Sequence, residues 1–216
     1  MKDVILERIV TGAYAPGERL VETRIAQELA ISQAPVREAL RDLEQLGCVV
    51  HEPFRGCSVR AFSPQELLDA FPVRAALEAL AARTAAERIT PAALVLLESL
   101  VEEMRAAARA GDAHVQSRAN AEFHATIVRA AGNPTLERQW ALLEPFSRTY
   151  ITASRPGIDL VELTERHVPI LDAIRARDGQ AAGRAMERHL MEAAEMLRAG
   201  LRDRPEEDPM TRRKAS

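Results

Sequence analysis

The chain has 216 residues, which is enough for one large domain or two modest ones. It is rich in Ala, Leu, Glu and Arg and only 4% aromatic, which favours helices, and its net charge of −3 gives no general indication of nucleic-acid binding. It has no long apolar run and no signal-peptide pattern, which argues against a membrane span and export, so we expect a cytoplasmic protein.

The N-terminal stretch predicts three helices. We expect helices over residues 2–11 and 22–30, separated by a turn. A two-residue break, Ile31-Ser32, leads into a third helix, which ends at Gly47. Two helices joined by a tight turn, with the second one longer, form a helix-turn-helix pattern.

The third helix has two different faces. Gln33, Arg37 and Arg41 are four residues apart and therefore share one face, and Ser32 is a predicted N-cap that accepts a hydrogen bond from the first turn. The opposite face carries an apolar stripe, formed by Val36, Ala39, Leu40, Leu43 and Leu46. In a major groove Arg pairs with guanine and Gln with adenine, so we interpret this segment as a DNA-recognition helix.

A β-hairpin, or wing, is predicted over residues 48–60. Two short strand candidates flank the turn Glu52–Gly56, which puts Arg55 near the tip. Cys48 and Cys57 lie in this hairpin without the spacing of a metal or redox pair. We therefore expect free thiols in a reducing compartment, with a local disulfide as the alternative.

The charge of this N-terminal part limits how it can bind DNA. Residues 1–62 contain eight Lys or Arg and nine Asp or Glu, a net charge of −1. DNA binding then requires basic side chains to be gathered on one face, and the affinity should fall as salt rises.

An ordered motif runs through these elements. It comprises Ile9, Gly12, Tyr14, Pro16, Gly17 and Leu20, then Ala26, Leu29, Ile31 and Ser32, then Pro35-Val36-Arg37-Glu38-Ala39-Leu40, then Leu43, Gly47, Gly56 and Val59. Over about residues 4–61 the motif resembles the winged-helix domain of GntR-type bacterial transcription regulators. We therefore assign residues 1–62 to a winged helix-turn-helix domain.

The resemblance implies double-stranded operator DNA as the partner. The DNA-binding residues that it implies are Thr23, Arg24, Ser32, Gln33, Ala34, Arg37, Arg41, Arg55 and Gly56. Gln33 and Ala34 stand where the family often has Arg and Thr, so we expect a base preference shifted away from guanine opposite Gln33. A homodimer would match a pseudo-palindromic operator.

Residues 63–203 show only helical patterns. Ser63 is a predicted N-cap, with Pro64 in the first turn and Glu66 closing a capping box. Later helices are expected to start or break at Thr90-Pro91, Gly111-Asp112, Asn133-Pro134, Arg155-Pro156-Gly157 and Asp178-Gly179.

The predicted fold class is therefore mainly α. A winged helix-turn-helix of three helices and a small β-hairpin is followed by an all-α antiparallel bundle of about six helices, since short connections imply antiparallel neighbours. Pro145 and Pro169 fall inside helical patterns and should kink them or mark their starts. The charged, Pro-containing tail 204–216 is predicted to be disordered.

Three of the five histidines follow a pattern. Asn120 and His124 are four residues apart and share a helical face, and His167 and His189 each lie 11 residues from Asp178-Gly179. A helical hairpin folded at Asp178-Gly179 places the latter two at the same height. Three converging imidazoles are a plausible metal site, with ordinary core or surface histidines as the alternative.

The second half also resembles a known family. The segments that carry this resemblance are Val73-Arg74-Ala75-Ala76-Leu77-Glu78, Phe123-His124, Ala131-Gly132-Asn133-Pro134, Glu165-Arg166-His167 and His189. They are similar to the helical FCD ligand-binding domain of the FadR subfamily of GntR-type regulators, over roughly residues 63–200. The resemblance implies that Asn120, His124, His167 and His189 ligate a divalent transition metal, with Zn as the first choice and Ni, Mn or Fe as alternatives.

An Asn in this set leaves the four ligands uncharged, so the cation keeps more of its charge and should attract an anion. We expect a small organic carboxylate at or beside the metal. Arg74 is the first candidate for its charged partner and Arg148 the weaker one, with a surface or interhelical role as the alternative for Arg74.

The predicted function is a metabolite-responsive, homodimeric transcription regulator, in which ligand binding changes operator affinity. A metal-dependent hydrolase that uses the three histidines is one alternative. No general base can be assigned to it, since Glu122 and Glu165 are out of phase or unplaced, so we expect no enzyme. A regulator whose bundle binds an apolar acyl ligand without metal is the other alternative, and the histidines argue against it.

Overall fold

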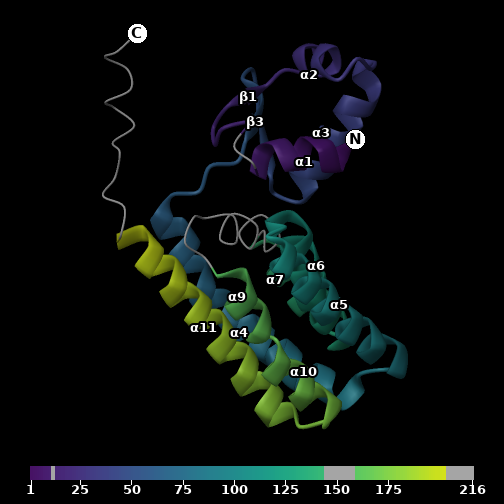
Figure 1. The fold of residues 1–216 in the computed structure, drawn as a ribbon, viewed down its shortest axis with the longest axis vertical. Coiled ribbons are helices and arrows are strands. Elements are labelled where there is room, and N and C mark those ends of the chain that lie inside the picture. The colour runs from purple at the N-terminus through teal and green to yellow at the C-terminus, as the bar shows by residue number, and fades with distance from the viewer. Residues whose placement is uncertain (11–12, 144–158, 203–216) are drawn as a thin grey trace.

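The computed structural model describes residues 1–10, 13–143 and 159–202 and shows a small N-terminal unit above a larger helical bundle (Figure 1). The predictions for Pro145, Arg148 and Arg155-Pro156-Gly157 and for the tail 204–216 concern residues outside these ranges. Within them, the predicted fold class is confirmed: helices dominate, and a small sheet follows the first three helices.

The N-terminal unit contains α1 (Lys2–Val10), α2 (Glu22–Glu28) and α3 (Gln33–Gln45). The apolar stripe of α3 is buried against residues of α1 and α2, including Ile5 and Ile25, which have no exposed surface. Ser32 is the N-cap of α3, but its side chain makes no capping hydrogen bond, so that part of the prediction is wrong. Its hydroxyl is exposed on the surface of the unit instead.

The wing is part of a three-stranded antiparallel sheet. β2 (Val49–Glu52) and β3 (Gly56–Val59) form the predicted hairpin, with His51 opposite Cys57. A third strand, β1 (Arg19–Leu20), pairs with the other edge of β3 and was not predicted. Two residues are too few to show a strand periodicity. Both cysteines are buried free thiols, so the disulfide alternative is wrong.

The bundle begins at a complete capping box. The Ser63 side chain accepts from the Glu66 backbone, and the Glu66 carboxylate accepts from the Ser63 backbone, as predicted. From there α4 (Pro64–Arg88) extends along α11 (Gly179–Arg202), its main neighbour (Figure 1).

Between these two helices in the sequence lie α5 (Pro91–Ala110), α6 (Ala113–Ala130), α7 (Pro134–Ala141), α9 (Leu160–Glu165) and α10 (Val168–Arg175). Side chains of Thr90, Asp112 and Asn133 cap α5, α6 and α7. The described residues thus form seven bundle helices instead of about six. The helix predicted up to about Arg177 is two helices, because Pro169 cannot donate a backbone hydrogen bond and begins a new helix after His167.

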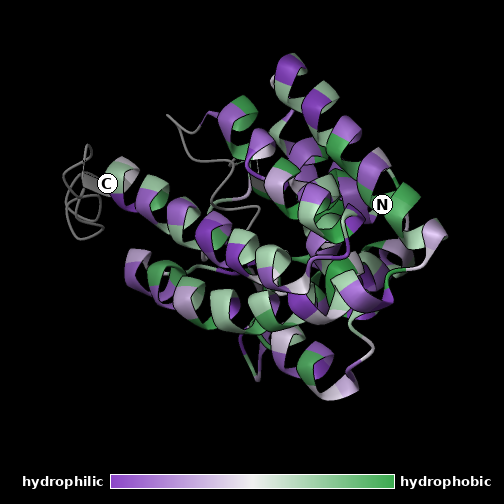
Figure 2. Cartoon of the chain, turned by 90° about the horizontal axis from the view of Figure 1, so that it is seen from below, coloured by the Kyte–Doolittle hydropathy of each residue, from purple (hydrophilic) through white to green (hydrophobic). Residues whose placement is uncertain are grey.

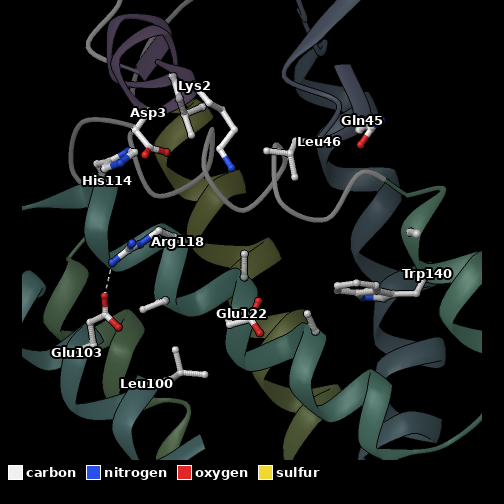
Figure 3. A pocket seen from close by; sticks show the side chains of 15 residues that line it. Lys2, Asp3, Gln45, Leu46, Leu100, Glu103, His114, Arg118, Glu122 and Trp140 are labelled. Carbon is white, nitrogen blue, oxygen red and sulfur yellow. Dashed lines mark hydrogen bonds and ion pairs between the residues drawn. The ribbon is translucent and has the colours of Figure 1, made fainter. Parts of the chain in front are cut away.

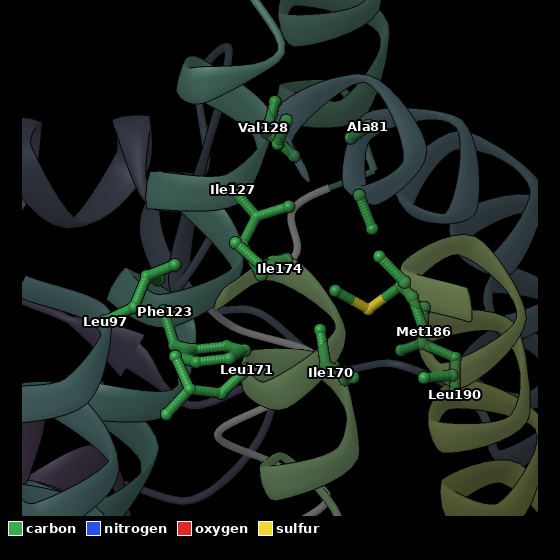
Figure 4. Packing of buried hydrophobic residues seen from close by; sticks show 14 of the residues in the cluster. Ala81, Leu97, Phe123, Ile127, Val128, Ile170, Leu171, Ile174, Met186 and Leu190 are labelled. Carbon is green, nitrogen blue, oxygen red and sulfur yellow. The ribbon is translucent and has the colours of Figure 1, made fainter. Parts of the chain in front are cut away.

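Among the described residues, the bundle core is made of aliphatic side chains together with two methionines and two phenylalanines, Phe71 and Phe123. Figure 4 shows Phe123 and Ile127 of α6 facing Ile170, Leu171 and Ile174 of α10. Every helix carries both polar and apolar residues along its length (Figure 2). Among the described helices, none combines the length and the apolar character that a membrane span requires. The histidines are buried against this packed core, with the His167 ring in contact with Phe123, which restricts their positions.

Candidate metal centre and DNA-binding face

The structure brings together the three histidines from three helices. His124 lies on α6, His167 immediately before α10 and His189 on α11, and they are 2%, 0% and 4% exposed. Their ring centroids are 4.3–5.5 Å apart, and one potential ligand atom of each lies within 4.8 Å of the others. The spacing argument correctly predicted that His167 and His189 meet across the α10–α11 turn.

The protons on two of these rings can be assigned from their partners. His167 Nδ1 lies 3.0 Å from the carbonyl oxygen of Thr164, which can only accept, so Nδ1 carries the proton. His124 Nδ1 contacts a carboxylate oxygen of Glu78 and is protonated for the same reason. With the proton on Nδ1, the Nε2 atom of each neutral ring keeps a free lone pair, which is the form that binds a metal.

Asn120 lies one turn before His124 and points at the same cluster. Its Oδ1 is 3.2 Å from His167 Nε2. Two lone pairs that face each other in a buried site repel unless a cation lies between them or the amide turns so that its Nδ2 donates to the ring. His189 Nδ1 is also buried and has no hydrogen-bond partner among the described residues. These three atoms fit a bound cation better than they fit an apolar core.

A buried carboxylate completes the cluster, and the sequence analysis missed it. Glu78 on α4 has no exposed surface, and its Oε1 accepts from Arg74 Nε at 2.8 Å and Trp140 Nε1 at 2.9 Å. Its Oε2 accepts from His124 Nδ1. The sequence analysis weighed only Glu122 and Glu165 as carboxylates near the histidines and assigned no role to Glu78. Glu78 orients His124 as carboxylates orient metal-ligating histidines.

The same geometry changes the interpretation of Arg74. It is buried, and it forms an ion pair with Glu78 one turn later on α4. Its charge compensates the carboxylate of Glu78, so the pair is neutral together. The only sequence signal for this pair was the i, i+4 spacing of opposite charges, which also occurs on solvent-exposed helix faces.

Burial sets the protonation of the cluster. Desolvation, together with the neighbouring His124, lowers the pKa of His167 to about 3, and it lowers the pKa of His189 well below its ordinary value. Burial alone would raise the pKa of Glu78, but Arg74, His124 and Trp140 hold it at about 2. At neutral pH, His167 and His189 are therefore uncharged and the Glu78 carboxylate is ionised.

A cavity of about 20 Å³ lies beside the cluster, lined by Phe71, Arg74, Asn120, His124, Leu163, His189, Leu190 and Ala193. That volume has room for roughly one water or metal ion. An organic ligand would have to widen it.

The predicted DNA-binding residues all lie on the surface of the N-terminal unit. Thr23, Arg24, Ser32, Gln33, Ala34, Arg37, Arg41, Arg55 and Gly56 are exposed. Three of the four arginines already bind a carboxylate. Arg37 holds Glu22 through Nε and Nη2 at 2.9–3.2 Å, Arg24 pairs with Glu18, and Arg55 pairs with Glu52.

Arg41 has no ion-pair partner among the described residues. The wing tip adds a residue that the sequence analysis did not single out. Phe54 is fully exposed and has a φ of 67°, a conformation that aromatic residues rarely adopt. A turn of the form Pro-Phe-Arg-Gly carries no sequence signal that distinguishes a protruding Phe from one folded back on the sheet.

Two family models match the chain. Residues 1–59 match the family described as bacterial regulatory proteins, gntR family, and residues 69–192 match the FCD domain.

Curated relatives align along most of the chain. It is 36% identical over 190 residues to a probable D-xylose utilization operon transcriptional repressor of Paenarthrobacter nicotinovorans, covering 88% of this chain and 84% of that protein. It is 30% identical over 199 residues to the HTH-type transcriptional repressor RspR of Escherichia coli K12, covering 90% and 86%.

The fold matches that of a solved structure, E. coli McbR/YncC. The TM-score is 0.72 at 24% identity, over 93% of this chain and 96% of that one.

Proposed function

Since the chain belongs to the gntR family of bacterial regulatory proteins and carries an FCD domain, we propose that it is a metabolite-responsive regulator whose bundle holds a divalent metal. It is a DNA-binding transcriptional regulator and not an enzyme. The proposal adds the two ligands that would govern its response: a transition metal, zinc before nickel, manganese or iron, and a small organic carboxylate.

The metal would be held by His124, His167 and His189, with Asn120 as the fourth ligand. The observation that carries this assignment is the convergence of three buried imidazoles with potential ligand atoms within 4.8 Å of one another. Glu78 and the Thr164 carbonyl fix the orientations of His124 and His167. When bound, the metal would supply a positive charge that attracts an anionic ligand.

The carboxylate would bind beside the histidines, where Arg74 lines the small cavity. Because that cavity has room for only about one water, an organic acid must push apart the helices that line it. This need to open the bundle gives the ligand a preference for one arrangement of helices, which any change in DNA affinity requires. Arg148 stays a second candidate for the ligand's charged partner.

A homodimer in the bacterial cytoplasm would bind a pseudo-palindromic operator. Each N-terminal unit offers few unpaired cations, so two units on one duplex would provide the affinity that one lacks. Val73 and Leu80 of α4 are 49% and 44% exposed and lie two turns apart on one side of the helix. Such an apolar strip is suited to packing against a second copy.

Neither alternative function is favoured. The carboxylate nearest to the histidines, Glu78, accepts hydrogen bonds from Arg74, Trp140 and His124 and cannot also activate a water as a general base. A metal-free regulator of apolar acyl ligands would leave the convergence of three buried imidazoles without a purpose.

Metal analysis of the purified protein tests the centre. We expect about one zinc per chain in wild type and a loss of stoichiometric zinc in His124→Ala, His167→Ala and His189→Ala. His114→Ala is the matched control, since His114 lies on α6 outside the cluster. Stoichiometric metal that survives all three substitutions in the cluster would refute the site.

A thermal-shift screen tests the ligand class, because a ligand bound only by the folded state raises the melting temperature. Sugar acids are the first compounds to try, since one relative is a probable repressor of a D-xylose utilization operon. They should stabilise the zinc-loaded protein and leave the His124→Ala variant unchanged. Neutral sugars of the same carbon number serve as controls for the carboxylate.

A further inference from the structure

Trp140 touches the histidine cluster from the outside. It is the single tryptophan of the chain, and it lies on α7. Its indole Nε1 donates a 2.9 Å hydrogen bond to Glu78 Oε1, and the other oxygen of Glu78 accepts from His124. One side chain therefore separates Trp140 from a histidine of the proposed metal centre.

The same tryptophan also borders the N-terminal unit. It lines a cavity of about 550 Å³ between the two units of the chain (Figure 3). The N-terminal unit contributes Lys2, Asp3 and Leu6 of α1 together with Gln45 and Leu46 at the end of α3. Those last two residues terminate the proposed recognition helix. Trp140 is half-buried, so it is in contact with the bundle and still borders this open space.

We propose that Trp140 is the positioning residue that couples the histidine centre to the placement of the DNA-binding unit. The inference rests on the metal site proposed above. A His124 ring whose Nε2 holds a cation becomes a stronger donor at Nδ1, which draws the negative charge of the Glu78 carboxylate toward Oε2. Oε1 then becomes a weaker acceptor for the Trp140 indole, so the hydrogen bond between them loosens.

This change reaches the DNA-binding unit through α7. The helix has eight residues and is anchored at its start by the Asn133 cap, so it can move as a rigid piece at its Trp140 end. The cavity beside Trp140 leaves room for such a movement, whereas a packed interface would block it. A change at Trp140 therefore alters one wall of the cavity that α1 and the end of α3 also line.

The first test uses Trp140 as its own reporter. Protein stripped with EDTA is titrated with Zn²⁺, a closed-shell ion, while tryptophan emission is recorded and zinc binding is measured separately by competition with a chelator. We expect the emission to change and to saturate with the same Kd as zinc binding. Zinc that binds without any change in emission overturns the coupling, and absence of zinc binding overturns the metal site instead.

The second test asks whether the signal reaches the DNA-binding unit. Trp140→Phe keeps an aromatic ring and removes the N–H donor, while Leu142→Ala alters an exposed neighbour on the same helix end as a matched control. Hydrogen exchange of the full chain is compared with and without Zn²⁺. We expect zinc to change protection of α1 and the end of α3 in wild type and in Leu142→Ala, and not in Trp140→Phe.

The same variants are then compared on the intergenic duplex upstream of the protein's own gene. We expect zinc to change wild-type affinity for that duplex by about 5- to 150-fold, the usual range of coupling between two sites, and by less than about twofold in Trp140→Phe. Zinc binding by Trp140→Phe should persist, because no ligand is removed. A Trp140→Phe protein that binds zinc and keeps the wild-type zinc response in α1 and α3 refutes the proposal. If that variant does not fold, hydrogen exchange of the wild-type protein with and without Zn²⁺ still decides the question, and unchanged protection of α1 and the end of α3 on zinc binding refutes the proposal.

Discussion

Replacing Glu78 with Gln is the sharpest test of how the centre is built. Gln has nearly the volume of Glu, so the change leaves no cavity, but it removes the negative charge and replaces one acceptor oxygen with an NH2 donor. The change breaks the ion pair of Glu78 with Arg74, which is buried on both sides, since the Arg74 side chain is 4% exposed and that of Glu78 is 0% exposed. The substitution should therefore destabilise the fold strongly although it changes a single atom.

The size of the effect follows from the burial. Breaking a buried ion pair by removing one partner costs about 3–5 kcal/mol, because the other charge stays in a medium of low polarity. We expect about 3 kcal/mol, the lower end, since the Gln amide oxygen can still accept from Arg74 or Trp140. For a chain of this length that corresponds to a fall in Tm of about 6–12 °C.

Urea unfolding at pH 7 after treatment with EDTA measures this loss without a contribution from bound metal. Glu87→Gln is the matched control, since Glu87 is an exposed residue near the end of the same helix, and it should change the free energy of unfolding by less than about 0.5 kcal/mol. The Arg74→Met/Glu78→Gln double variant should recover part of the loss. A cost for Glu78→Gln below about 1 kcal/mol would show that Arg74 finds water or another partner, and would refute the reasoning.

Four further predictions concern single residues. Asn120→Asp adds a negative charge to the metal ligands and should tighten zinc binding by about tenfold or more in a chelator competition, whereas Asn120→Ala should weaken zinc binding. Equal zinc affinities in both variants and wild type would show that Asn120 is not a ligand. Arg41→Ala should weaken DNA binding and reduce the slope of log affinity against log salt by about one, with an unchanged melting curve, and an unchanged slope would place Arg41 away from the phosphates. Phe54→Ala should lower DNA affinity and leave Tm unchanged, because the Phe54 side chain is fully exposed and contributes no core packing. DNA binding as tight as that of wild type would show that the ring has no role at the DNA. Burial raises the pKa of the Cys57 thiol to about 11, so at pH 8 its reaction with a disulfide reagent should be at least about a hundredfold slower in the folded protein than in urea, and rapid labelling of the folded chain would contradict this.

The sequence carried most of the fold because its signals are local. The Ser63 capping box and the caps at Thr90, Asp112 and Asn133 each need only three or four consecutive residues to act, and each starts a helix where expected. The meeting of His167 and His189 also followed from chain geometry, because one tight turn fixes the pairing of two antiparallel helices. Pro169 changed the helix count without moving His167 from that position.

The parts that the sequence could not supply depend on packing between distant elements. Glu78 lies on α4, which contacts α6, α7, α10 and α11, so no single apolar face shows which of its side chains point inward. Trp140 reaches Glu78 across 62 residues of sequence, a distance over which spacing carries no information. The strand β1 could not be predicted for the same reason, because its pairing with β3 joins residues almost forty positions apart.

The arginine–carboxylate pairs on the DNA-binding face bear on how this domain can hold DNA. Exposed pairs such as Arg37–Glu22 contribute about 1 kcal/mol at most, so exchanging the carboxylate for a phosphate costs little. The carboxylates nevertheless stay close to the duplex, where they repel phosphates and offset part of each new contact. A unit with a net charge of −1 therefore gains little from unspecific attraction, and its selectivity must come from contacts that only the right bases offer. When each DNA-binding unit binds DNA only weakly by itself, the dimer holds its operator only if both units reach their half-sites. Small changes in the spacing of the two units then have a large effect on the occupancy of the operator. That is the setting in which a signal transmitted from the histidine centre to α1 and α3 would be most effective.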